Sequence, residues 1–89
     1  MIVLFEIRDR IPDVSAPWIE ARDRFLAGQS RAARDLSNAL KGKARPERAE
    51  DYVLLIEIAR ACGKLKPYLA LVRAAMRVFP DDPYVRLYW

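Results

Sequence analysis

Three of the six prolines in this 89-residue chain are evenly spaced: Pro12, Pro46 and Pro80 lie 34 residues apart. Proline cannot continue the interior of a helix, because it lacks a backbone N–H and its ring clashes with the preceding turn. A fixed period of roughly 20 to 50 residues is typical of repeat proteins in which each repeat is one supersecondary unit. Three prolines can align by chance, so the prediction of a repeat depends on the residues between them.

Length and composition favour one small globular domain over residues 1–89. A chain this short buries only about 60–65% of its unfolded surface, so its core is thin and a partner or a second copy would help to complete it. Hydrophobic residues make up 53% of the chain, which is ample for folding. The chain has no His or Thr, and Arg outnumbers Lys twelve to four, a usage that indicates a GC-rich bacterial genome.

The sequence predicts a soluble, cytoplasmic protein with no membrane partner. The apolar stretch Met1–Phe5 lacks the basic start of a secretory signal and is cut short by Glu6. No apolar run approaches the roughly 20 residues that a membrane-spanning helix needs.

We expect no catalytic, cofactor or metal site, no small-molecule substrate and no enzymatic activity. No His is available as a general base, and no Ser lies in a recognisable triad pattern. Cys62 is the only cysteine, which excludes an internal disulfide. We expect it to be a buried structural thiol at a helix C-terminus, where the dipole disfavours a thiolate. Asp81 and Asp82 stand directly before Pro83 and indicate a helix cap rather than metal ligands.

Hydrophobic periodicity predicts an all-α fold of five or six short helices. Residues 1–11 can form a helix with Leu4, Ile7 and Ile11 on one face, or a strand, because apolar residues also alternate there. We favour the helix, since the repeat register calls for one.

Turn residues divide the rest of the chain into elements. Helices are predicted over residues 17–27, closed by Gly28, and from an N-cap at Ser30 to about Gly42. A charged connection over residues 43–50 follows them.

The second half of the chain is more apolar. Its first helix runs to about Cys62, ends at Gly63 and has little polar face, so we expect it to be central and packed on more than one side. The next helix is predicted from near Pro67 to Phe79, and a short last helix over residues 83–89.

Residues 49–82 resemble a tetratricopeptide repeat, a 34-residue helix–turn–helix unit. The resemblance is carried by an aromatic residue, a leucine, two small residues, a turn glycine and a closing proline: Tyr52, Leu55, Ala59, Ala75, Gly63 and Pro80. It implies antiparallel helix–turn–helix pairs in a right-handed array; the alternative is a small irregular helical bundle. In this register residues 1–14 form a partial repeat or capping helix, 15–48 a degenerate repeat and 83–89 a terminal helix.

The degenerate repeat departs from the pattern in its second helix. Trp18 lies 34 residues before Tyr52, as the register requires. The same register places Arg34, Asn38 and Lys41 at positions where the later repeat carries apolar or small residues. The first full repeat is therefore predicted to be degenerate, or to have a shorter second helix and a longer loop.

The resemblance implies a protein–protein interaction module, an adaptor or chaperone-like scaffold with no chemistry of its own. Tyr84, Tyr88 and Trp89 crowd the last six residues, where a repeat array normally carries a polar cap. Aromatic residues dominate interface hot spots, so we expect this end to dock onto a partner or a second copy, as in a homodimer. The alternative is that these aromatics fold back onto the preceding two helices as core.

In the resemblance, a concave groove is lined by the first helix of each repeat. This implies Glu50, Val53, Glu57 and Arg60 as partner-binding residues. Family members that clamp a peptide C-terminal carboxylate use Lys and Asn on this surface. This chain carries Val53 and Glu57 instead, so a clamp of that type is not implied.

The net charge of +4 is concentrated in the middle third of the chain, where residues 22–48 carry eight basic and three acidic groups. Six of these basic residues form a candidate patch: Arg31, Arg34, Lys41, Lys43, Arg45 and Arg48. They could neutralise phosphates, which gives an alternative function as a small nucleic-acid-binding protein using residues 31–48. No aromatic residue is interleaved with them for base stacking, and an acidic protein partner would use the same patch.

Overall fold

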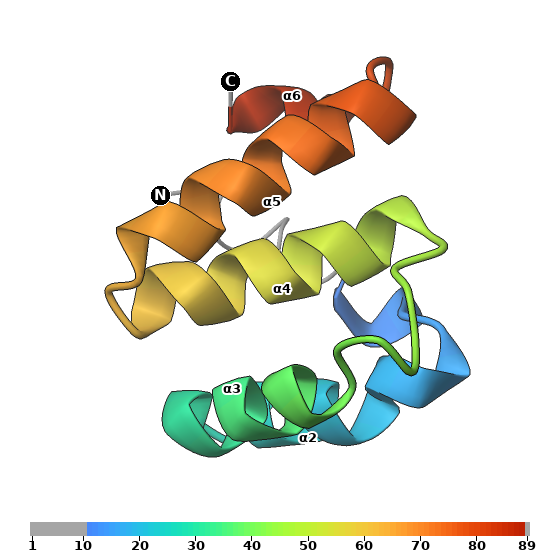
Figure 1. Cartoon of the computed structure of the whole chain (residues 1–89). Coiled ribbons are helices and arrows are strands. Elements are labelled where there is room, and N and C mark those ends of the chain that lie inside the picture. Colours follow the sequence, from blue (N-terminus) through green and yellow to red (C-terminus); the bar gives the residue numbers. More distant parts are fainter. Residues whose placement is uncertain (1–10, 89) are drawn as a thin grey trace.

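A computed structural model describes residues 11–88, and this part of the chain is all-α with no strand, which confirms the predicted fold class (Figure 1). Two 3₁₀ turns precede five α-helices: η1 (Ile11–Asp13), η2 (Ala16–Trp18), α2 (Ile19–Leu26), α3 (Ser30–Ala39), α4 (Ala49–Ala61), α5 (Leu65–Val78) and α6 (Pro83–Leu87). The helix predicted over residues 1–11, with its strand alternative, lies outside the described residues except for Ile11.

The helices form two hairpins. Helix α2 packs along α3, and α4 packs along α5, while α3 also lies against α4 and thereby joins the hairpins (Figure 1). Helix α6 turns back onto α5 and α4. The predicted helix–turn–helix pairs are present, and a right-handed, tetratricopeptide-like array stays a prediction.

Helix α4 is central, as its apolar sequence predicts. Val53, Leu54 and Ile58 are buried in a core shared with η1, α2 and α3. Ile56 and Ala49 are buried in a second core that includes residues of α5 and α6. A helix with apolar residues on several sides must be covered on each of them, which explains why both hairpins and α6 gather around α4.

Glycine closes each hairpin at the predicted position. Gly28 has φ of 82° and Gly63 has φ of 67°, a left-handed conformation that favours glycine. In both turns the N–H of the next residue bonds back, at 2.9 Å, to the carbonyl five residues before it. This pattern satisfies the last carbonyls of α2 and α4 and turns the chain sharply into the next helix.

Two helix starts differ from the prediction. Ser30 is the first residue of α3, and the N-cap position belongs to Gln29, whose side chain makes no capping bond. Helix α5 begins at Leu65, and Pro67 lies in its first turn, where no intrahelical N–H bond is lost. The start of α6 agrees with the prediction, because the Asp82 carboxylate accepts hydrogen bonds from two backbone N–H groups of that helix.

A buried carboxylate joins the two halves of the fold. Asp51 is fully buried in the first turn of α4 and accepts three backbone hydrogen bonds. One comes from the N–H of Ser15 at 2.7 Å, and the others come from Glu47 and Arg48 at 2.9 and 3.1 Å. The sequence analysis did not single out Asp51, which ties the start of the described chain to the connection between the hairpins.

Candidate functional site

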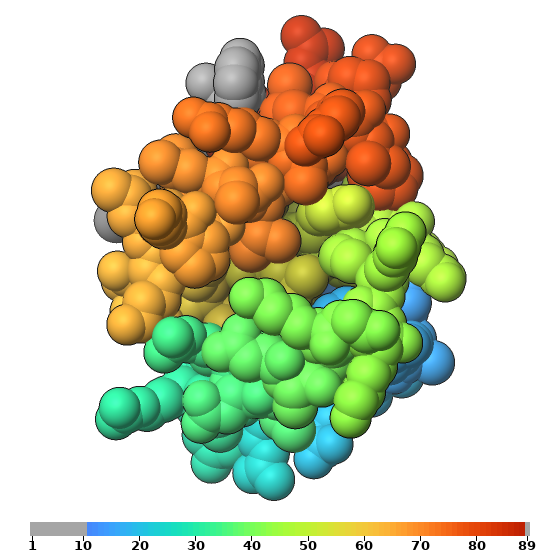
Figure 2. Space-filling view, viewed as in Figure 1, coloured from blue at the N-terminus to red at the C-terminus, as the bar shows by residue number. Residues whose placement is uncertain are grey.

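A cleft of about 550 Å³ lies between the two hairpins, and we call it the inter-hairpin cleft. In the space-filling view, the α3 and α5 segments face each other across α4 (Figure 2). The lining comes from both hairpins and their connection: Trp18, Arg34, Ser37, Asn38, Lys41, Gly42, Ala44, Pro46, Leu55, Ile58, Ala59, Lys64, Pro67, Ala70 and Leu71. The walls are therefore mostly apolar, with a small number of polar groups among them.

The cleft coincides with the departure of the first hairpin from the repeat pattern. Arg34, Asn38 and Lys41 all line it. In the repeat register these positions correspond to residues of α5, of which Val72 and Ala75 are buried against neighbouring helices. Polar side chains at these places cannot seal α3 against α4 and α5 as apolar ones would. The chain therefore keeps an open cleft at the position where the second hairpin has a packed interface.

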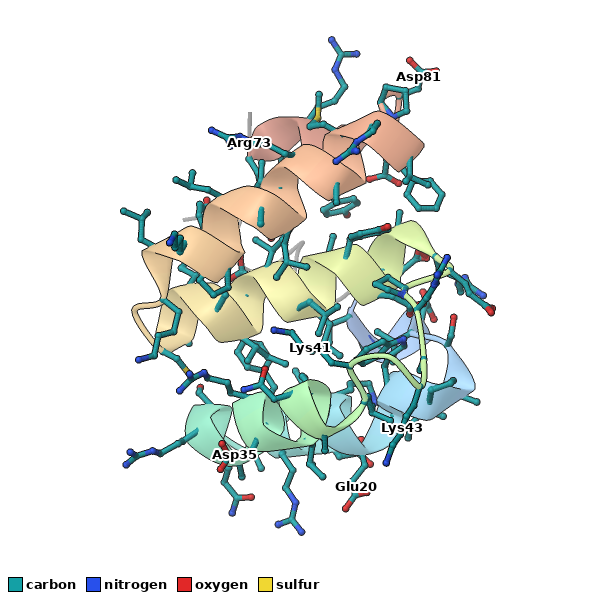
Figure 3. The ribbon with its side chains drawn as sticks, in the orientation of Figure 1. Glu20, Asp35, Lys41, Lys43, Arg73 and Asp81 are labelled. Carbon is teal, nitrogen blue, oxygen red and sulfur yellow. The ribbon has the colours of Figure 1, made fainter. Side chains whose placement is uncertain are left out.

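The charged groups that the described residues bring to the cleft are cationic. Among residues 11–88, its lining includes Arg34, Lys41 and Lys64 but no Asp or Glu. None of the three has an ion-pair partner within residues 11–88. Figure 3 shows Lys41 between α3 and α4, whereas Glu20 and Asp35 lie on the side of the α2–α3 hairpin away from α4. The cleft thus has a local positive potential that no described carboxylate neutralises.

The indole of Trp18 forms part of the cleft wall and is only 3% exposed. Its Nε1 is buried and lacks a hydrogen-bond partner among the described residues. A buried donor without a partner costs about 1–3 kcal/mol, so native structures leave few of them.

A shallower depression of about 330 Å³ adjoins the cleft at the turn between α4 and α5. Ala59 and Lys64 line both, and the depression adds Arg60, Leu65 and Tyr68. The positive rim therefore continues around the end of α4. Arg60 is the only one of the four residues predicted for the concave groove that is exposed.

The other three predicted groove residues face the interior. Val53 is fully buried, and Glu50 and Glu57 are each 8% exposed. The Glu57 carboxylate accepts a hydrogen bond of 2.7 Å from the hydroxyl of Tyr88 and lies 3.6 Å from the guanidinium of Arg60. The face of α4 expected to form an open groove is thus covered by the chain itself in this structure.

Tyr88, one of the terminal aromatics, folds back onto the helices before it. Besides its bond to Glu57, its ring packs edge-on against Tyr68 with centroids 6.3 Å apart. Burial raises the pKa of Tyr88 above its ordinary value, and the nearby Glu57 charge raises it further. Tyr84 is half-buried against the core of the first hairpin, and Trp89 lies outside the described residues.

The structure divides the predicted basic patch between two places. Arg34 and Lys41 belong to the inter-hairpin cleft. The remaining four, Arg31, Lys43, Arg45 and Arg48, are exposed outside it, and Arg48 pairs with Glu50 at 3.2 Å. The sequence analysis missed the contributions of Trp18 and Lys64, because only the packing of the two hairpins brings them beside α3.

Cys62 is half-buried, and its thiol donates to the carbonyl of Ser30 at 3.5 Å, a contact between the two hairpins. Residues 11–88 contain no group of three or more His, Cys, Asp or Glu side chains that could hold a metal ion. No helix in this same part of the chain is long and apolar enough to cross a membrane.

Comparisons with protein-family models, with curated proteins and with solved structures gave no match. The tetratricopeptide resemblance stays a prediction, and the functional argument depends on the geometry of the cleft.

Proposed function

We propose that the protein is a protein–protein interaction module that docks a segment of its partner into the inter-hairpin cleft. The observation that carries the proposal is a single cleft of about 550 Å³ that combines apolar walls with cations lacking an ion-pair partner in the described part of the chain. Binding sites of this size typically combine a mostly apolar lining with a few polar groups that fix orientation. The tetratricopeptide resemblance, with its adaptor or chaperone-like implication, favours the same class of function.

Docking would gain free energy from apolar burial and orientation from the cations. Half-buried Leu55 and Leu71 offer apolar surface from α4 and α5, and its burial is worth about 25 cal/mol per Å² removed from water. Charged groups at the edge of an interface act more on encounter rate and partner choice than on affinity. The proposed mechanism is therefore recognition by shape and charge, with no chemical step.

Filling the cleft tests the proposal. A library of random 12-residue peptides would be selected on the whole protein, and the enriched peptides compared on two variants. Ala70→Trp places an indole in the cleft, whereas Ala27→Trp places one at an exposed position outside it. We expect enriched peptides to bind the wild type and Ala27→Trp equally, and Ala70→Trp at least about tenfold more weakly. A failure to enrich any peptide, or equal binding to all three proteins, would contradict the proposal.

Self-association is a second form of the same function. Leu87 is 52% exposed on α6, beside the half-buried Tyr84 and Tyr88, so this end of the chain offers an apolar surface to a second copy. Light scattering over a concentration series, with and without residues 84–89, tests it. A dimer that becomes a folded monomer on truncation supports the homodimer, and a monomer at every concentration contradicts it.

The nucleic-acid alternative is favoured by the exposed cations outside the cleft. Lys43 and Arg45 project from the connection between the hairpins, where phosphates could approach them freely. Replacing Lys41, Lys43, Arg45 and Arg48 by Glu should abolish retention of a single-stranded oligonucleotide if this alternative is correct. An oligonucleotide that the wild type does not retain at low salt would contradict it.

A further inference from the structure

We infer that the inter-hairpin cleft binds an acidic segment, one that carries at least two carboxylate side chains together with apolar residues. This inference rests on the proposed function and names the chemistry of the partner. The starting observation is local charge: Arg34, Lys41 and Lys64 line one cleft to which residues 11–88 contribute no Asp or Glu. The Debye length at physiological ionic strength is about 8 Å, so charges around one cleft add while distant carboxylates are screened.

The walls of the cleft increase the effect of these cations. Leu55, Ile58 and Leu71 are low-dielectric neighbours that focus the field into the cleft. The same apolar surface requires apolar side chains from the occupant, because a purely acidic chain would leave it unfilled. An occupant that alternates carboxylates with aliphatic or aromatic side chains satisfies both features.

The spacing of the cations favours several acidic side chains over one chain-terminal carboxylate. Arg34 lies in α3 and Lys41 lies in the turn that follows this helix. Lys64 stands on the opposite hairpin, at the turn before α5. The three cations therefore come from three separate segments around the cleft, which lets several acidic side chains pair with them at once.

Trp18 favours a peptide over a nucleic acid as the occupant. It is the one aromatic residue that the described part of the chain contributes to the cleft wall, and at 3% exposed it offers no free face for base stacking.

The test begins from the same random peptide library. We expect the pool enriched on the wild type to be net negative and rich in apolar residues. A pool that is neutral or basic, yet still excluded by Ala70→Trp, would overturn this inference and leave the proposed function standing. A library that yields no enriched pool would defeat both. A homodimer that Ala70→Trp dissociates would make a second copy the occupant and also overturn it.

Two matched charge-reversal variants then test whether the cations of the cleft bind the acidic peptides. The cleft triple variant is Arg34→Glu, Lys41→Glu and Lys64→Glu. The control triple variant, Lys43→Glu, Arg45→Glu and Lys66→Glu, has the same net charge but reverses exposed cations outside the cleft. Individual enriched peptides would be titrated against both, with Trp18 fluorescence in a Trp89→Phe background as the readout.

We expect the cleft triple variant to bind the acidic peptides at least about tenfold more weakly than the control triple variant does. Equal loss in the two variants would show that overall charge, not the cleft, selects acidic peptides, and would overturn the inference. Circular dichroism of both variants checks that each remains folded before its affinity is compared.

Discussion

Asp51 shows how a single buried carboxylate can organise a small fold. Its two oxygens accept three backbone N–H bonds, from the segment before α2 and from the connection before α4. The free-energy cost of burying a carboxylate is offset only when hydrogen bonds replace those that it made to water. All three hydrogen bonds to Asp51 are 3.1 Å or shorter. This one residue therefore links the segment before α2 to the connection between the two hairpins.

Asp51→Ala should therefore lower the free energy of unfolding by about 3 kcal/mol or more, because it leaves three backbone donors without an acceptor. Urea denaturation followed by circular dichroism measures the change. Asp35→Ala, at an exposed position of α3, is the matched control and should stay within about 0.5 kcal/mol of the wild type. A loss below about 1 kcal/mol for Asp51→Ala would contradict the assigned role.

Tyr88 makes stability sensitive to alkaline pH. Burial and the Glu57 carboxylate raise the pKa of Tyr88 above its ordinary value of 10.0, so the folded state keeps a proton that the unfolded state releases. The contribution of this retained proton to the free energy of unfolding is complete below about pH 10. Above that pH it declines by at most about 1.4 kcal/mol per pH unit. Unfolding of the wild type should therefore become easier between about pH 9 and pH 11 to a greater extent than that of Tyr88→Phe. Parallel pH profiles of the two proteins would contradict this prediction.

At the scale of the elements, the glycine-terminated helix ends were the most predictable part of the structure. Gly28 and Gly63 end helices as expected, because glycine adopts the left-handed conformation of a helix end more readily than other residues do. Periodicity likewise predicted α4 as the central helix. The first residues of α3 and α5 were predicted less accurately, since Ser30 and Pro67 each fit more than one position in a first turn.

Gly63→Ala tests the turn that sets one hairpin. No atom would contact the new methyl group within 4 Å, so the cost arises from the left-handed φ of 67° alone. We expect a loss of about 1–2 kcal/mol in the free energy of unfolding by chemical denaturation. Gly63→Asn should cost less, because Asn tolerates this conformation better. An Ala variant as stable as the wild type would show that the turn does not depend on glycine.

At the scale of the whole molecule, the packing of the two hairpins creates the inter-hairpin cleft, which neither hairpin would form alone. The sequence indicated that the first hairpin departs from the repeat pattern, because Arg34, Asn38 and Lys41 break the repeat register. It did not indicate that Lys64 would complete a cationic rim from the second hairpin. That juxtaposition depends on how α3 meets α4, which follows from tertiary packing and not from local pattern. For the same reason, the sequence did not reveal that the face of α4 expected to form an open groove is covered by the chain itself.

The most direct test of the cleft as a docking surface is an NMR titration of the ¹⁵N-labelled protein with a peptide enriched in the library selection. The account predicts shift changes at the backbone amides of Arg34, Ser37, Lys41 and Ala70 and at the indole N–H of Trp18, with residues remote from the cleft unchanged. Changes concentrated on Leu87 and Tyr88, or on the exposed connection around Lys43, would contradict it.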